Sequence, residues 1–190
     1  MTYSVRCFAD VLGRLKEGGL DGVVIGSTAY ALRLGVKEFE DDVDLFATSF
    51  SPISDEDMVY DVAERVGCQV GSSEWGTARL ECIVGGECVV PVEFHENIHD
   101  FYIPPEVIEG AEALVLEGVE VKVIRVEDYI LLKARAGRDQ DLEDLGYISD
   151  LIRTGELKID FKLIKNRLKL FDEDDRRLIT RRLISVNVKI

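Results

Sequence analysis

The chain has no long hydrophobic run. In its 190 residues no apolar stretch approaches the roughly 20 residues that a membrane-spanning helix needs. The first residues also lack the basic region and the following apolar block that are typical of a secretory signal. We therefore expect no association with a membrane and a location in the cytoplasm.

Cysteine, histidine and the side-chain amides are scarce. The sequence holds four Cys and two His, with no Cys-x-x-Cys pair and no finger-like spacing between the two residue types. A zinc site is therefore not expected, and the cysteines are predicted to be reduced, mostly buried thiols. Asn and Gln together number five, a scarcity that hints at a thermophilic source.

Positive charge is also in deficit. Lys and Arg number 23 against 37 Asp and Glu, so the net charge is −14, and a chain this acidic is a poor general binder of nucleic acid. Residues 151–190 are the exception, with a net charge of +5 that leaves −19 for the rest. This basic stretch forms either a local patch for RNA or nucleotide phosphates or, as we favour, a solvated helix face that pairs with the acidic part.

A Gly-Ser turn near the N-terminus joins a strand to a helix. The apolar run 23–25 ends at Gly26, and Ser27 opens an amphipathic stretch with apolar residues at helical spacing. The unpaired N–H groups at such a helix start favour a phosphate. The alternative is a turn that binds nothing, since Gly and Ser are common turn formers.

Two carboxylates follow on the next predicted strand. Asp42 and Asp44 alternate with apolar residues, so both project from one face of that strand. Neighbouring carboxylates repel each other unless a cation lies between them, which points to a hard divalent metal, Mg2+ or alternatively Mn2+. The competing interpretation is the solvent face of an edge strand.

Taken together, these features resemble the polymerase-beta-type nucleotidyltransferase superfamily. Its signature is a Gly-Ser turn, a short helix and Asp-x-Asp on the next strand, and Gly26-Ser27 and Asp42-Val43-Asp44 stand in those places. The resemblance implies a nucleoside triphosphate as substrate and a third metal-binding acid on a later strand, where Glu93 falls. A solvent-facing Glu on a half-exposed strand is the alternative. We interpret His95 and His99 as loop residues rather than a metal pair.

A second resemblance lies in the helical part of the chain. Residues 129–145 look like the last two motifs of the abortive-infection nucleotidyltransferase toxins and their relatives. In that branch a helix lysine and a later acid complete the nucleotide site, and the matching residues here are Lys133 and Asp141. The alternative is a salt bridge between these two residues that only ties two helices together.

The order of predicted elements indicates an α+β fold. Helices at 5–15 and 55–66, strands around 23–25 and 42–46, and hairpins at 79–94 and 113–124 predict a small mixed sheet with helices packed on it. From 126 onward the pattern is helical. We expect a nucleotidyltransferase core at 1–125 and a C-terminal helical region at 126–190 that completes the site.

These inferences combine into a functional hypothesis. Gly26 and Ser27 bind the phosphates, while Asp42, Asp44 and Glu93 hold the metal. A nucleoside monophosphate passes to an acceptor hydroxyl on RNA, protein or a small molecule, and pyrophosphate leaves. Two alternatives remain: a catalytically silent nucleotide-binding or regulatory protein, and a toxin–antitoxin component. The apolar stripe of Phe161, Ile164, Leu168 and Phe171 is either core or a surface for a protein partner or a second copy.

Overall fold

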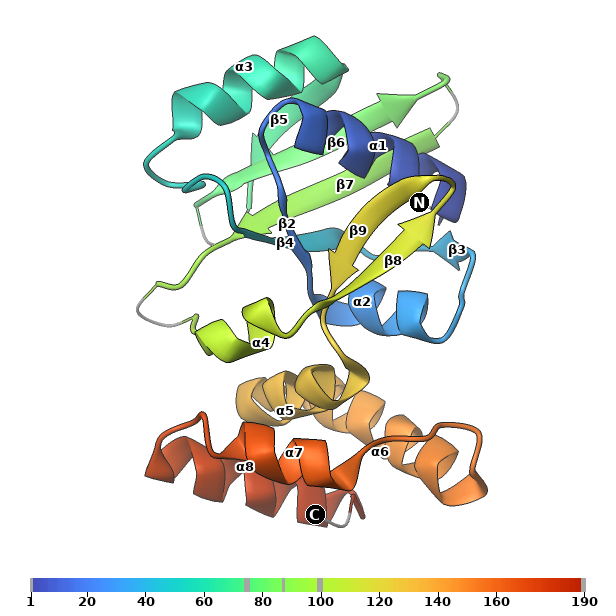
Figure 1. Ribbon diagram of the computed structural model, residues 1–190, viewed down its shortest axis with the longest axis vertical. Coiled ribbons are helices and arrows are strands. Elements are labelled where there is room, and N and C mark those ends of the chain that lie inside the picture. Colours follow the sequence, from blue (N-terminus) through green and yellow to red (C-terminus); the bar gives the residue numbers. More distant parts are fainter. Residues whose placement is uncertain (1, 74–75, 87, 99–100, 189–190) are drawn as a thin grey trace. The chain divides into compact units, whose positions relative to one another are not determined.

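The computed structural model describes residues 2–73, 76–86, 88–98 and 101–188, which form two compact units (Figure 1). The first unit comprises Met1–Tyr102 and Gly110–Ile124, and the second comprises Ile103–Glu109 and Arg125–Ile190. The expected division at 125/126 therefore differs from the two units in one segment. Residues 103–109 pack with the second unit, where the Arg167 side chain donates a hydrogen bond to the Glu106 carbonyl at 2.6 Å.

The first unit is built around a mixed sheet in which seven described strands run in the order β5-β6-β7-β4-β2-β9-β8. Strands β4 and β7 are parallel neighbours, as are β2 and β9, and the other pairs are antiparallel. The strands are β2 (Gly22–Val24), β4 (Val43–Ala47), β5 (Cys68–Ser72), β6 (Ala78–Val84), β7 (Cys88–His95), β8 (Glu112–Leu116) and β9 (Val119–Val123). A separate two-stranded ladder pairs β1 (Tyr3–Ser4) with β3 (Glu38–Phe39).

Three helices pack on this sheet: α1 (Val5–Glu17), α2 (Gly26–Arg33) and α3 (Glu56–Val66). Helix α1 begins where the Ser4 side chain accepts a hydrogen bond from the Cys7 amide, and it buries an apolar face that includes Phe8 and Leu15. Helices α1 and α3 contact each other and both contact β6, while α2 packs against β4. The predicted mixed α+β fold is confirmed.

The four cysteines correct the sequence prediction of reduced thiols. All four lie in the first unit, where Cys68 pairs with Cys82 and Cys7 with Cys88 as disulfides. The first bond joins directly opposed residues of β5 and β6. The second joins α1 to the first residue of β7. Cysteine spacing in the sequence missed both pairs because the partners meet only through sheet pairing and helix packing.

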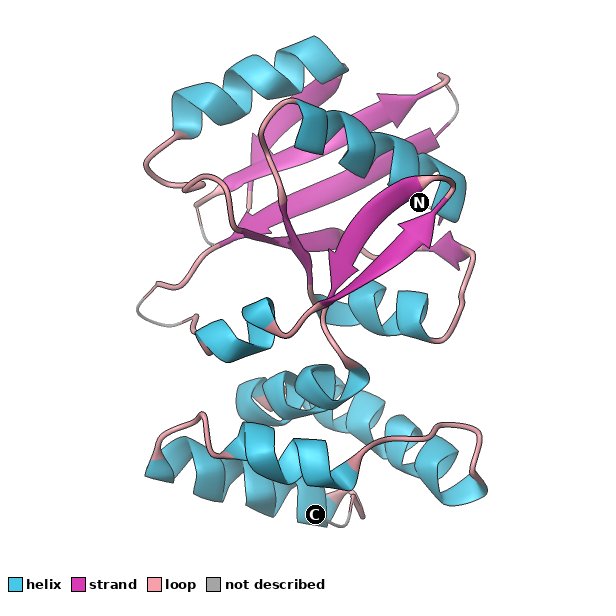
Figure 2. Ribbon diagram, in the orientation of Figure 1, coloured by secondary structure: helices cyan, strands magenta, loops and turns pink. Residues whose placement is uncertain are grey.

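In the described residues of the second unit, helices joined by loops are the regular structure (Figure 2). Its helices are α4 (Pro105–Glu109), α5 (Val126–Ala136), α6 (Asp139–Thr154), α7 (Phe161–Leu168) and α8 (Glu173–Ser185). Helix α5 packs against α6, α7 and α8, as its nearly all-round apolar sequence predicts. Ile164 and Phe171 are buried here, which favours core over a partner surface for the apolar stripe.

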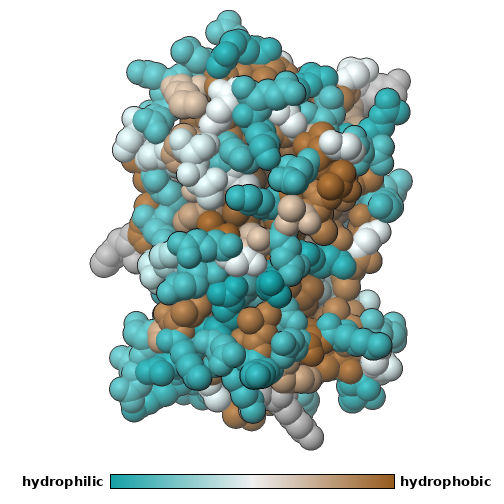
Figure 3. Space-filling model, in the orientation of Figure 1, coloured by the Kyte–Doolittle hydropathy of each residue, from teal (hydrophilic) through white to brown (hydrophobic). Residues whose placement is uncertain are grey.

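Hydrophilic side chains dominate the face of the molecule in Figure 3, with apolar ones scattered between them. Such scattered apolar side chains are ordinary on a folded protein. Among the described residues no helix has the length and apolarity to cross a membrane.

Candidate functional site

Three neighbouring strands of the first unit place charged side chains in one row. Arg79 on β6 lies opposite Glu93 on β7, and Glu93 lies opposite Asp44 on β4. Directly paired residues project from the same face of a sheet, so these three side chains share a face. Val43, Leu45, Val92 and Phe94 alternate with the acids and are buried on the opposite face. The apolar neighbours therefore fix the direction in which the acids point.

Helix α2 begins beside this row. The Ile25 amide donates a hydrogen bond to the Asp44 carbonyl at 2.9 Å, and the helix starts at Gly26 with no side-chain cap and no acidic residue in its first turn. Gly26 has φ of +66°, and a Cβ there would lie 2.0 Å from Oδ2 of Asp44. Only glycine fits this position, because any side chain would push the Asp44 carboxylate away.

Asp42 lies just before β4 and is held by two contacts. The Thr28 hydroxyl donates to its carbonyl at 2.9 Å, and Nη2 of Arg79 donates to its Oδ1 at 3.0 Å. Nε of the same Arg79 lies 3.6 Å from Oε1 of Glu93. Arg79 therefore bridges two of the three predicted acids and partly neutralises them.

The surroundings of the Glu93 carboxyl disfavour its charged form. Its pKa is raised above the usual range, first by burial and then by repulsion from the carboxylates of Asp42 and Asp44. The side chains of His95 and Arg79 oppose this rise without cancelling it. A cation placed among the acids would relieve the repulsion, as the sequence pattern suggested.

His95 corrects the interpretation of a loop histidine. It is the last residue of β7, it is only 7% exposed, and its ring stacks on Phe101 with centroids 5.1 Å apart. Its Nε2 lies 2.9 Å from Oδ1 of Asp44. The signal was present in the sequence, because His95 follows Glu93 by two residues and shares its face if the strand continues. His99 lies outside the described residues.

The donor atoms of Asp44, Glu93 and His95 fit a metal ion. One ligand atom from each residue lies within 4.8 Å of the other two. Two carboxylate oxygens and one imidazole nitrogen are a chemically reasonable set for a divalent ion. Asp42 is not part of this three-residue set.

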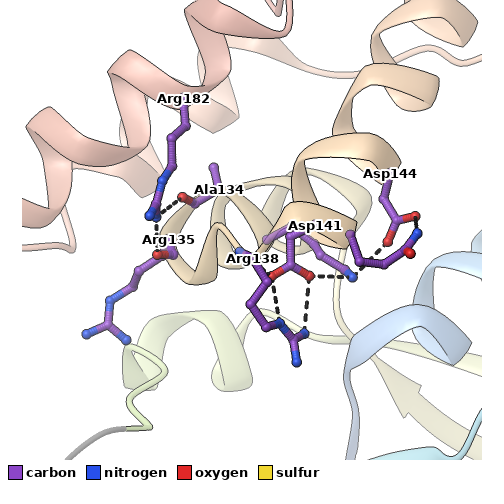
Figure 4. A network of polar contacts seen from close by, with 8 residues as sticks. Ala134, Arg135, Arg138, Asp141, Asp144 and Arg182 are labelled. Atoms are coloured by element: carbon purple, nitrogen blue, oxygen red, sulfur yellow. Dashed lines mark hydrogen bonds and ion pairs between the residues drawn. The ribbon is translucent and has the colours of Figure 1, made fainter.

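Lys133 and Asp141 lie in the second unit, where the structure links them directly. Figure 4 shows Asp141 beside Arg138 and Asp144. Lys133 Nζ donates to Oδ1 of Asp141 at 2.7 Å and to Oδ2 of Asp144 at 2.8 Å. Asp141 is fully buried and also accepts hydrogen bonds from the side chain and backbone of Arg138. The salt bridge between α5 and α6 that the sequence left open is thus present.

These contacts shift both pKa values of the pair. Burial alone would raise the pKa of the Asp141 carboxyl, but hydrogen bonds from Arg138 and Lys133 outweigh it and lower that pKa to about 2. Burial alone would lower the pKa of Lys133, but hydrogen bonds to Asp141 and Asp144 outweigh it and raise that pKa. Both groups are therefore charged at neutral pH.

The structure thus brings Gly26, Asp44 and Glu93 together in the first unit, with Asp42 joined to them through Arg79. Ser27 follows Gly26 in the first turn of α2 and is half-buried. Sequence reasoning missed Arg79 and His95. Arg79 carries no sequence signal, because only the antiparallel register of β6 and β7 places it opposite Glu93.

Comparison with known proteins gives one family match. The model of a family described as "Nucleotidyl transferase of unknown function (DUF2204)" matches residues 4–185. No curated protein matches the chain.

Several solved structures are similar to this chain at low identity. An antigenic nucleotidyltransferase-like protein from Paracoccidioides brasiliensis is 16% identical, with a TM-score of 0.60, and the match covers 100% of this chain and 96% of that one. JHP933 from Helicobacter pylori is 17% identical, with a TM-score of 0.45 over 97% of this chain and 79% of that one. The antibiotic-resistance factor ANT(2'')-Ia is 17% identical, with a TM-score of 0.46, and the match covers 95% of this chain and 91% of that one. The first likeness shows a nucleotidyltransferase-like fold.

Proposed function

Because the chain belongs to this family of nucleotidyl transferases, we propose that it transfers a nucleoside monophosphate from a nucleoside triphosphate to an acceptor hydroxyl. The observation that carries the proposal is the row of Asp44, Glu93 and Arg79 beside the start of α2, where Gly26 leaves room for the Asp44 carboxylate. Acidic side chains beside a helix N-terminus suit a metal–triphosphate complex, since the helix attracts phosphate and the acids attract the metal.

Each residue has a role in this proposal. The N–H groups at Gly26 and Ser27 bind the β- and γ-phosphates. Asp42, Asp44 and Glu93 hold the metal, Mg2+ or alternatively Mn2+. The bound metal would neutralise the triphosphate and polarise the α-phosphate.

The reaction needs little covalent chemistry from the protein. The acceptor oxygen forms a bond to the α-phosphorus, the bond from that phosphorus to the bridging oxygen breaks, and pyrophosphate leaves. The Glu93 carboxylate orients the acceptor hydroxyl and takes its proton.

For Lys133 and Asp141 we propose a part in binding the triphosphate, with Asp141 orienting Lys133. The support is the resemblance of residues 129–145 to the abortive-infection toxin-like branch, to which we assign the chain. The division into a core at 1–125 and a helical region at 126–190 belongs to the same proposal. In this proposal the reaction takes place in the cytoplasm.

The test is label transfer from each α-labelled triphosphate with Mg2+ or Mn2+, in separate reactions with total RNA, cell protein and small-molecule extracts. Asp44→Asn is the active-site variant, and Asp150→Asn is the matched control because Asp150 is an exposed helix residue. We expect wild type and Asp150→Asn to label one acceptor class and Asp44→Asn to label none. Undiminished transfer by a folded Asp44→Asn protein would contradict the assignment.

One observation favours a second candidate, a nucleotide-binding protein without chemistry. Arg79 and His95 already contact the acids, at 3.0 Å to Asp42 and 2.9 Å to Asp44. Such a protein, acting as a regulator or as a toxin–antitoxin component, would bind triphosphate without releasing pyrophosphate. Calorimetric titration combined with a pyrophosphate assay separates the two candidates, and sedimentation detects a partner or a second copy.

A further inference from the structure

We propose that Asp44, Glu93 and His95 form a carboxylate–imidazole metal site that favours a first-row transition ion such as Mn2+ over Mg2+. This inference rests on the proposed function, because it names the ligands and the ion of the same site. In the inferred site, His95 takes the place of Asp42 as the third metal ligand beside Asp44 and Glu93.

The distances agree with ligands of one ion. Neighbouring ligands of an octahedral ion with bonds of about 2.1 Å lie about 3 Å apart, and opposite ligands lie about 4.2 Å apart. His95 Nε2 and Asp44 Oδ1 are 2.9 Å apart, and the three donor atoms lie within 4.8 Å of one another. The pair at 2.9 Å already has the spacing of neighbouring ligands, and a closure of at most about 0.6 Å brings all three atoms within reach of one ion.

His95 is held in place from several sides. It is nearly buried, its ring stacks on Phe101, and it lies opposite Phe46 in the parallel register of β7 and β4. A buried ring held in this way loses little conformational entropy when it coordinates a metal. This fixed placement is the difference between His95 and a mobile surface histidine.

Asp42 has a different partner. Its Oδ1 accepts a hydrogen bond from Arg79, whose guanidinium is placed by the β6–β7 register. In this arrangement Asp42 fixes Arg79 and does not bind the ion. Two carboxylates then balance the charge of a divalent ion, and the neutral imidazole adds a nitrogen ligand.

The ligand set decides which ion is preferred. Mg2+ takes oxygen ligands and keeps much of its water, whereas imidazole nitrogen suits transition ions. A site with one imidazole therefore binds Mn2+ more tightly than Mg2+, and the preference depends on His95. The competing role for His95 is that of a hydrogen-bond donor that only orients the Asp44 carboxylate.

The experiment measures nitrogen coordination directly in the full chain without an affinity tag. Mn2+ is added to the purified protein, and electron spin echo envelope modulation records coupling between the ion and ¹⁴N of an imidazole. The chain has only two histidines, so His95→Gln and its matched control His99→Gln assign the coupling to one residue. Circular dichroism and thermal melting check that each variant is folded.

We expect imidazole coupling in wild type and His99→Gln and none in His95→Gln. His95→Gln should also weaken Mn2+ binding by about tenfold or more and Mg2+ binding much less. Absence of the coupling in metal-loaded wild type, or its persistence in His95→Gln, would overturn the inference, and the wild-type result is decisive even if the variant fails to fold.

The label-transfer assay keeps the two proposals distinguishable. Bound Mn2+ without nitrogen coupling, together with Asp44-dependent transfer, would refute the histidine ligand and leave the proposed function intact. Failure of the protein to bind Mn2+, with no transfer in either metal, would overturn both.

Discussion

At the residue scale, the contact between Gly26 and Asp44 is the most demanding feature of the site. Gly26→Ala would place a Cβ 2.0 Å from Oδ2 of Asp44 at a φ of +66°. We expect a loss of about 2–4 kcal/mol in the free energy of unfolding, from backbone strain and steric overlap together, and a loss of triphosphate binding. Urea denaturation and calorimetric titration measure the two effects.

Gly35→Ala is the matched control for this change. Gly35 has a similar φ of +75°, but a Cβ there meets no atom within 4 Å. Gly35→Ala should lower the free energy of unfolding only through backbone strain, by about 1 kcal/mol, and leave triphosphate binding unchanged. Equal effects of the two variants would show that the Asp44 carboxylate does not limit position 26.

Arg79 provides a second prediction at this scale. Its guanidinium neutralises Asp42 and Glu93, so it competes electrostatically with a metal for the same acids. Arg79→Gln should therefore tighten Mn2+ binding, by a few-fold to about tenfold, as measured by the free Mn2+ signal in electron paramagnetic resonance.

The control for Arg79→Gln is Arg153→Gln, which removes the same charge from an exposed position on α6. Its Mn2+ affinity should equal that of wild type. Weaker Mn2+ binding by Arg79→Gln would mean that the arginine supports the metal site instead of competing with the ion.

The sequence predicted acids that the structure places side by side, and it missed the basic residues around them. Asp44 and Glu93 stand in strands whose apolar neighbours mark the buried face, so their common face follows from a period of two. His95 becomes visible once β7 is extended two residues past Glu93, and Arg79 only when the strands are paired. Pairing depends on long-range register, which one sequence without its fold does not specify.

At the scale of elements, the α5–α6 pair gives a prediction about acid stability. The Asp141 pKa of about 2 lies below its unfolded value of about 3.9. A depressed carboxyl pKa contributes stability that is fully present above pH 4 and is lost as the pH falls from about 4 to about 2. The contribution is roughly 2 kcal/mol, measured by urea denaturation at a series of pH values.

Asp141→Asn separates this carboxyl from the many others that titrate in the same range. The variant is less stable at neutral pH because Lys133 and Arg138 lose a partner. Its free energy of unfolding should then fall less steeply than that of wild type between pH 4 and pH 2. Parallel pH profiles would rule out Asp141 as the source of the acid-labile stability.

Elements with strong local signals were predicted well. The predicted hairpin of β8 and β9 turns at Glu117 and Gly118, both with positive φ. Helix α8 has a strong start signal of its own, because the Asp172 side chain accepts a hydrogen bond from the Asp175 amide. Strand β5 was missed because its residues are mostly exposed and show no clean alternation. The short elements β1, β3 and α4 were missed because elements of two to five residues are too short to show a periodic pattern.

At the scale of the whole molecule, the two disulfides predict a dependence on redox state. Cys7 and Cys88 are 81 residues apart in sequence, and closing such a loop restricts the unfolded chain by about 4–5 kcal/mol in the chain-entropy estimate. Cys68 and Cys82, 14 residues apart, add about 3 kcal/mol in the same estimate. Reduction should therefore lower stability in the first unit.

The measurement is urea denaturation with and without dithiothreitol, together with alkylation of the unreduced, denatured protein. We expect no alkylated cysteine before reduction and four after it. The Cys7→Ser/Cys88→Ser protein should reproduce most of the stability loss without reductant. Four alkylated cysteines in the unreduced protein would contradict the pairing.

The alternation along β7 also links correct folding to activity. Val92 and Phe94 fill the core while Glu93 points to the site, so a shift of this strand by one residue would exchange the two sets. A molecule with this one-residue shift would bury a carboxylate and remove Glu93 from the face of Asp44 in the same event. The core residues of β7 therefore guard the placement of Glu93, because the shift that misplaces the acid also empties the core.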